Sequence, residues 1–118
     1  MDPKLIILAS YLGTGILIGG LGVPLLWEMI PPNIWYGFKT PSTLKHEEIW
    51  YPVNRVSGYW MVLTGVACSG TSICAYLADF DIATATWANL AVCMSCIVLM
   101  IVHSVRVLLR LKAKLQSP

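Results

Sequence analysis

Three long apolar runs dominate the pattern of hydrophobic and polar positions along the chain. No charged residue occurs in 5–27 or in 56–78, and within 82–105 the only ionisable side chains are His103 and the cysteines. Each run exceeds the roughly 18 apolar residues that mark a membrane-spanning helix. The first run has 23 residues and would rise about 34 Å as a helix, enough to cross a hydrocarbon core of about 30 Å with some tilt.

The runs therefore predict an all-α membrane protein with three transmembrane helices and a long aromatic-rich interfacial loop between the first two. The first run is too long in its apolar part to be a cleaved signal peptide. We expect one domain, residues 1–118, that consists of helices over about 5–28, 56–78 and 84–108, the loop 29–55, and a basic tail over 109–118.

The charged residues, only 12% of the chain, are distributed unevenly between the two sides of the membrane. Three spans leave one Lys or Arg, Lys4, on the N-terminal side. The other side holds seven: Lys39, Lys45, Arg55, Arg106, Arg110, Lys112 and Lys114. The positive-inside rule then predicts a cytoplasmic loop and C-terminus, with the N-terminus outside. The net charge of +2 is too small to indicate a nucleic-acid partner.

The loop between the first two spans contains most of the unusual residues. Eight of the twelve aromatic residues lie between Trp27 and Trp60. Trp35, Tyr36 and Phe38 are too close together for one helical stripe, and we expect them to lie as a mat at headgroup level.

A short helix is predicted later in the loop. Thr43 is expected to cap a helix that begins near Leu44, with Glu47 and Glu48 at its positive end. Pro52 should break or bend the connection into the second span, because proline removes a backbone donor.

The first apolar run is rich in glycine. Gly15 and Gly19 form a GxxxG step, which lets another helix approach closely in lipid. We expect this step to pack against the other two helices of the same chain, with homodimerisation as the alternative.

The loop resembles the signature of the SdpI family of small integral membrane proteins. In that family, as in residues 13–60 here, a Gly/Pro helix end precedes a PPN-x-x-YG-aromatic-basic-TP segment, a TL-x-x-x-E-x-W segment and an asparagine-basic pair. The residues that carry the resemblance, and that we predict to form a family-motif or partner-binding loop, are Asn33, Trp35, Tyr36, Gly37, Lys39, Thr40, Pro41, Thr43, Glu48, Trp50, Asn54 and Arg55.

The family takes its name from an immunity protein that protects a bacterium against its own secreted toxin and takes part in signalling. The resemblance thus implies a non-enzymatic role in protection or sensing at the bacterial inner membrane, with lipids and a peptide toxin as partners. The alternative is a small accessory or structural subunit docked on other transmembrane subunits of a larger complex.

Four charged loop residues are candidates for a binding cluster. Lys39, Arg55, Glu47 and Glu48 could together bind a headgroup, a peptide or a partner loop. The alternative is a set of solvated interfacial charges, whose pairs contribute little, roughly 0 to 1 kcal/mol each.

Two weaker candidates lie in the third run. His103 could ligate a haem or pigment, but a hydrogen bond between helices is the better interpretation because no second ligand lies at matching depth. Cys93, Cys96 and Met100 share a helical face suited to copper(I), although buried cysteines usually act as small hydrophobes.

No disulfide is expected, because all four cysteines lie in predicted lipid-embedded segments. The sequence has no phosphate loop, paired-carboxylate site or metalloprotease motif, so we predict no enzyme and no cofactor. A bound lipid is compatible with the loop.

Overall fold

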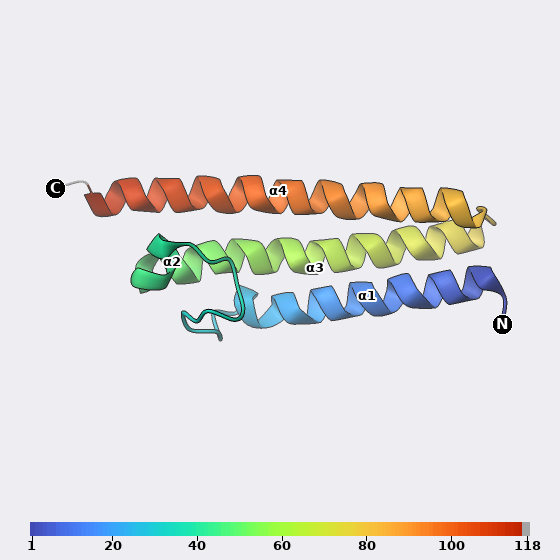
Figure 1. Cartoon of the computed structure of the whole chain (residues 1–118), viewed down its shortest axis with the longest axis horizontal. Coiled ribbons are helices and arrows are strands. Elements are labelled where there is room, and N and C mark those ends of the chain that lie inside the picture. Colours follow the sequence, from blue (N-terminus) through green and yellow to red (C-terminus); the bar gives the residue numbers. More distant parts are fainter. Residues whose placement is uncertain (117–118) are drawn as a thin grey trace.

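The computed structural model describes residues 1–116 and is built from helices. Its elements are α1 (Pro3–Leu26), α2 (Pro41–Lys45), α3 (Glu47–Leu77) and α4 (Ile82–Gln116). Three of them, α1, α3 and α4, are long and apolar enough to cross a membrane, which confirms the predicted all-α fold with three transmembrane helices. Figure 1 shows α3 lying between α1 and α4, and α3 makes most of the contacts between the helices.

The three long helices differ in length, and the excess lies at one end. A helix of 24 residues such as α1 rises about 36 Å, whereas the 31 residues of α3 and the 35 of α4 rise about 46 and 52 Å. The helices begin and end close together near the turn 78–81, which we call the turn end (Figure 1). At the opposite, loop end, the first turns of α3 and the last turns of α4 extend past the end of α1 (Figure 1). We call 47–57 and 104–116, together with 27–40 and α2, the cap.

The cap contains a small hydrophobic core of its own. Ile49 and Val53 of α3 pack against Leu108 of α4, and Phe38 of the loop packs onto them. These contacts explain why α4 continues to Gln116, although residues 109–118 were predicted to be a tail. Residues 117 and 118 lie outside the described part of the chain.

The second long helix begins nine residues before the predicted residue 56, at Glu47. Pro52 lies inside this continuous helix, so the predicted break there was wrong. Because Pro52 is in the second turn, it removes only the hydrogen bond to the carbonyl of Glu48. Glu48 is exposed, so water can satisfy that carbonyl.

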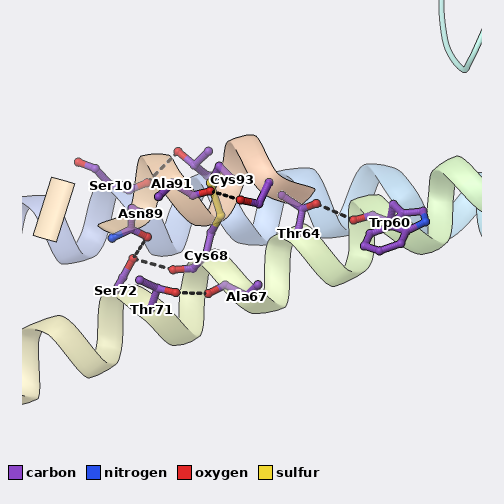
Figure 2. Close-up of a disulfide and its surroundings, with 12 residues drawn as sticks. Ser10, Trp60, Thr64, Ala67, Cys68, Thr71, Ser72, Asn89, Ala91 and Cys93 are labelled. Atoms are coloured by element: carbon purple, nitrogen blue, oxygen red, sulfur yellow. Dashed lines mark hydrogen bonds between the residues drawn. A yellow bond between two sulfur atoms is a disulfide. The ribbon is translucent and has the colours of Figure 1, made fainter. Parts of the chain in front are cut away.

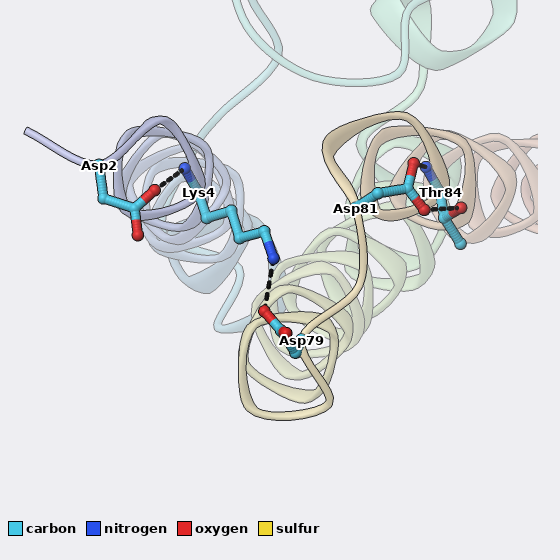
Figure 3. A network of polar contacts seen from close by, with 5 residues as sticks. All are labelled: Asp2, Lys4, Asp79, Asp81 and Thr84. Carbon is cyan, nitrogen blue, oxygen red and sulfur yellow. Dashed lines mark hydrogen bonds and ion pairs between the residues drawn. The ribbon is translucent and has the colours of Figure 1, made fainter.

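Both α1 and α3 end in the same left-handed turn with an acidic residue at its centre. Glu28 and Asp79 have φ values of 57° and 58°, where glycine is usual. Each carboxylate pairs with a cation of a neighbouring helix: Glu28 with Arg55 at 3.5 Å, and Asp79 with Lys4 (Figure 3). The hydrogen bond from Lys4 lowers the pKa of Asp79. The two pairs join α1 to the chain of α3 at both ends.

The middle of α1 contacts α3 through glycines. A Cβ atom at Gly22 would lie 2.7 Å from both the Gly58 carbonyl oxygen and the Met61 Cβ, and one at Gly15 would lie 2.8 Å from the Gly65 carbonyl oxygen. Gly19 also faces Gly65, but a Cβ there would lie 3.9 Å from the Gly65 Cα, an ordinary van der Waals contact. The GxxxG step thus packs against α3 of the same chain, one of the two helices that we expected it to contact, and only glycine fits at Gly15.

Polar side chains and one disulfide join α3 to α4. The Ser57 and Ser104 hydroxyls lie 2.9 Å apart, and the Ser72 hydroxyl donates to Asn89 Oδ1 at 3.0 Å. Between these two contacts Cys68 is bonded to Cys93, so the prediction of no disulfide was wrong (Figure 2). The physical reason is register: the antiparallel helices bring the two Cα atoms to 6.3 Å, within the usual disulfide range of about 4.4–6.8 Å.

Substitution of Gly22 by alanine should weaken the contact between α1 and α3. We expect Gly22→Ala to lower the free energy of unfolding by about 1–3 kcal/mol through overpacking, partly offset by the better helix propensity of alanine. Titration with sodium dodecyl sulfate in mixed micelles, followed by tryptophan fluorescence, measures this. Gly20→Ala is the matched control, because its added Cβ meets nothing within 4 Å; equal losses in both variants would contradict the glycine contact.

The disulfide predicts how many cysteines react with a maleimide in denatured, unreduced protein. Two should react, Cys74 and Cys96, and all four after reduction. In Cys68→Ser, Cys93 has no disulfide partner, so three cysteines should react in the unreduced protein. Mass spectrometry gives the counts, and four modified cysteines in the unreduced wild-type protein would show that the bond does not form.

Candidate functional site

Asn33 organises the first turn of the loop. Its Oδ1 accepts hydrogen bonds from the backbone N–H groups of Trp35 and Tyr36 at 2.9 and 2.7 Å, and its Nδ2 donates to the carbonyls of Pro31 and Tyr36 at 2.8 and 3.1 Å. A single side-chain amide therefore satisfies four backbone groups of a segment that has no regular secondary structure.

Asn54 of α3 holds the other side of the loop. It is 1% exposed, and its Oδ1 accepts from the backbone N–H of Phe38 at 2.6 Å while its Nδ2 donates to the carbonyls of Phe38 and Trp50. Gly37 has φ of 119°, and a Cβ there would lie 2.6 Å from Asn54 Oδ1 and 3.0 Å from the Trp50 ring. The close approach and the positive φ together require glycine.

Two further contacts fix the ends of the loop. Trp50 is fully buried and donates its Nε1–H to the carbonyl of Ile30 at 2.7 Å. Thr40 and Thr43 form a capping box at the start of α2, in which each side chain accepts the other's backbone N–H. The helix cap is thus Thr40 with Pro41 after it, and not Thr43 as predicted, because Thr43 is buried at the third helical position.

Five motif residues, Pro41 among them, remain exposed at the surface of the cap. Trp35 is 86% exposed, and Lys39, Glu48 and Arg55 are also exposed. Arg55 pairs with Glu28, and in residues 1–116 no ion pair joins the four members of the predicted charge cluster. That cluster is not assembled, because Glu47 and Glu48 lie in the first turn of α3, two turns before Arg55.

Tyr36 faces inward. Its hydroxyl is buried without a hydrogen-bond partner among the described residues, and burial raises the pKa of Tyr36. The phenol therefore stays neutral at physiological pH and can donate one hydrogen bond.

His103 makes the helix-packing contact that the sequence favoured. Its Nδ1 accepts a hydrogen bond from Trp60 Nε1 at 2.9 Å, with the two rings arranged edge to face. One ring nitrogen is therefore occupied by α3. The described residues contain no group of three or more His, Cys, Asp or Glu that could hold a metal ion.

The copper(I) candidates are not available as a set. Cys93 is bonded to Cys68, which leaves Cys96 and Met100 of the predicted three. Sequence reasoning missed Glu28 as the partner of Arg55, and the only signal would have been an acidic residue directly after a predicted helix end.

Loss of the Asn54 amide should release the loop. Asn54→Leu keeps the volume but leaves the Phe38 N–H and C=O without partners, each worth about 1–3 kcal/mol when buried. We expect chymotrypsin to cleave at 35–38 about tenfold faster or more, as measured by mass spectrometry of timed digests. Lys39→Ala, in the same loop but exposed, should cleave at the wild-type rate; equal rates in all three proteins would contradict the proposed role of Asn54.

The loop and the helices that follow it match a known protein family. The profile of the SdpI/YfhL protein family matches residues 29–105, which include the loop, α2, α3 and most of α4. The chain is similar to the uncharacterized protein YfhL of Bacillus subtilis (strain 168), with 31% identity over 65 residues that cover 51% of this chain and 59% of that protein. No solved structure matches the chain. Since the family profile covers more than half of the chain, this membrane protein belongs to the SdpI/YfhL family.

Proposed function

We propose that this protein acts without enzymatic chemistry in protection or immunity at the bacterial inner membrane, with the cap as the surface that recognises a peptide toxin or a sensing partner. The observation that carries the proposal is the ordered loop. Two asparagines, Asn33 and Asn54, fix its backbone, and yet Ile34 and Trp35 are left 67% and 86% exposed.

An exposed tryptophan on a fixed backbone is suited to recognition. Tryptophan is among the residues most often found at the energetic centre of protein interfaces, and a preformed loop loses little conformational entropy on binding. The chain itself covers neither side chain, and an exposed apolar pair of this kind is suited to contact with another protein or with the membrane. Trp35 and Ile34 therefore support a partner outside the chain.

The orientation belongs to the same proposal. The cap carries the seven cations that follow Lys4, and at the turn end Lys4 is paired with Asp79. We place the cap in the cytoplasm by the positive-inside rule, with the turn end outside.

The second candidate is an accessory or structural subunit of a larger membrane complex. The observation in its favour is that α4 continues to Gln116 and exposes Leu109 and Leu115 beside basic residues. Extraction in mild detergent, followed by native sizing and mass spectrometry, separates the two: stoichiometric migration with a large complex supports the subunit, and a free protein supports protection.

Replacement of Trp35 should reduce protection without unfolding the protein. In a strain that lacks the gene, expression of the wild-type protein should raise the concentration of peptide toxin that halves growth. For Trp35→Ala we expect this toxin concentration to be about tenfold lower than for the wild type, because the loss of one interface hot spot weakens binding about tenfold. Trp27→Ala, an exposed tryptophan outside the motif, should protect as well as the wild type. If the wild type gives no protection against any peptide tested, or the two variants behave alike, recognition through Trp35 is refuted.

A further inference from the structure

A groove runs along α4 where this helix enters the cap. Its volume is about 300 Å³, and it is lined by Trp60 of α3 and by Leu99, Val102, His103 and Arg106 of α4. His103 and Arg106 are exposed, so the surrounding membrane can reach both side chains. The groove therefore combines an apolar wall with two hydrogen-bond donors, and none of its lining residues is acidic.

The groove lies at the edge of the hydrocarbon core. The Ser57 and Ser104 hydroxyls are 2.9 Å apart, so Arg55 and Arg106, each two residues further into the cap, lie at about the same membrane depth. Arg55 pairs with Glu28, just past the end of α1, a helix that rises about 36 Å across a core of about 30 Å. Arg106 is therefore at the level of the lipid headgroups.

Arg106 differs from Arg55 in its counter-charge. Glu28 neutralises Arg55, whereas no ion pair joins Arg106 to an acidic side chain within residues 1–116. A cation at the edge of the hydrocarbon core is costly unless an anion neutralises it, and a guanidinium can bind phosphate through two parallel hydrogen bonds. Arg106 therefore calls for an anion from the membrane.

His103 supplies a second donor to the same groove. The Trp60 Nε1–H can only donate, so its hydrogen bond to His103 Nδ1 at 2.9 Å requires a lone pair on that nitrogen. In the ring form that accepts this bond the proton is on Nε2, and no hydrogen bond from Nε2 is found within residues 1–116. Side chains three residues apart on a helix have Cβ atoms about 5–6 Å apart, so one phosphate can accept from both His103 and Arg106.

We propose that the groove binds one anionic phospholipid of the leaflet beside the cap, with its phosphodiester between Arg106 and His103 Nε2. An acyl chain of this lipid lies along Leu99 and Val102. The charge of the cap favours an anionic headgroup over a zwitterionic one, because its seven Lys and Arg outnumber its three Glu. This inference does not depend on the proposed function, because it concerns the lipid alone.

Native mass spectrometry of the full chain in detergent micelles tests the proposal, with phosphatidylglycerol and phosphatidylethanolamine titrated separately. We expect the first phosphatidylglycerol to bind at least fivefold more tightly than the first phosphatidylethanolamine. Arg106→Gln should weaken phosphatidylglycerol binding at least tenfold, because it removes the charge that faces the phosphate. Arg110→Gln is the matched control: it removes the same charge one turn further along α4, outside the groove, and should weaken binding less than twofold.

Two further measurements test the groove itself. His103→Leu should weaken phosphatidylglycerol binding about fivefold, in line with the loss of one hydrogen bond. Glycerol phosphate, which has the phosphate but no acyl chain, should not displace the lipid at an equal concentration. Circular dichroism checks that each variant keeps its helices, which is expected because the replaced side chains are exposed.

Four results would overturn the proposal. Equal losses in Arg106→Gln and Arg110→Gln, or equal binding of the two lipids, would show only a general attraction between the membrane and the basic cap. Wild-type affinity in His103→Leu would remove the second donor from the site. Displacement of the lipid by glycerol phosphate would assign the site to a soluble phosphate compound.

Discussion

The buried amide of Asn54 holds an irregular segment of backbone against the end of α3. Irregular backbone near the hydrocarbon core is tolerated only where its N–H and C=O groups find partners, because water is scarce there. Asn54 supplies a donor and an acceptor to the same residue, Phe38, and Asn33 serves the preceding turn in the same way. The loop can therefore remain ordered with hardly any secondary structure of its own, and the exposed positions of Ile34 and Trp35 follow from that order.

The three transmembrane helices form the base for this arrangement. α3 meets α1 through glycines and meets α4 through small polar side chains, such as Ser57 with Ser104. Both contacts rely on small side chains, since helices in lipid gain little from burying large apolar ones. The close approach of α1 places Leu25 and the end of the helix beside Gly58, one turn after Asn54 in α3.

The sequence predicts the number and type of the transmembrane helices well. Each of the three apolar runs is long enough to cross the hydrocarbon core, and each is too apolar to lie at the surface of a soluble domain. It also identified the motif residues of the loop, but not their roles. Which asparagine bonds which carbonyl depends on contacts between residues 16 positions apart, such as Phe38 and Asn54. The start of α3 at Glu47 was missed because Pro52 is expected to break a helix. The sequence does not show that Ile49 and Val53, on either side of Pro52, pack against α4 and hold this part of the helix in place. The disulfide was missed because the register of α3 against α4 cannot be read from apolar runs.

Amide hydrogen exchange of the protein in nanodiscs tests the central claim, a loop fixed by two side-chain amides, most directly. The account predicts that the backbone N–H groups of Trp35, Tyr36 and Phe38 exchange at least about 100-fold more slowly than in an unfolded chain. Exchange of these three amides at the rate of an unfolded chain would contradict it.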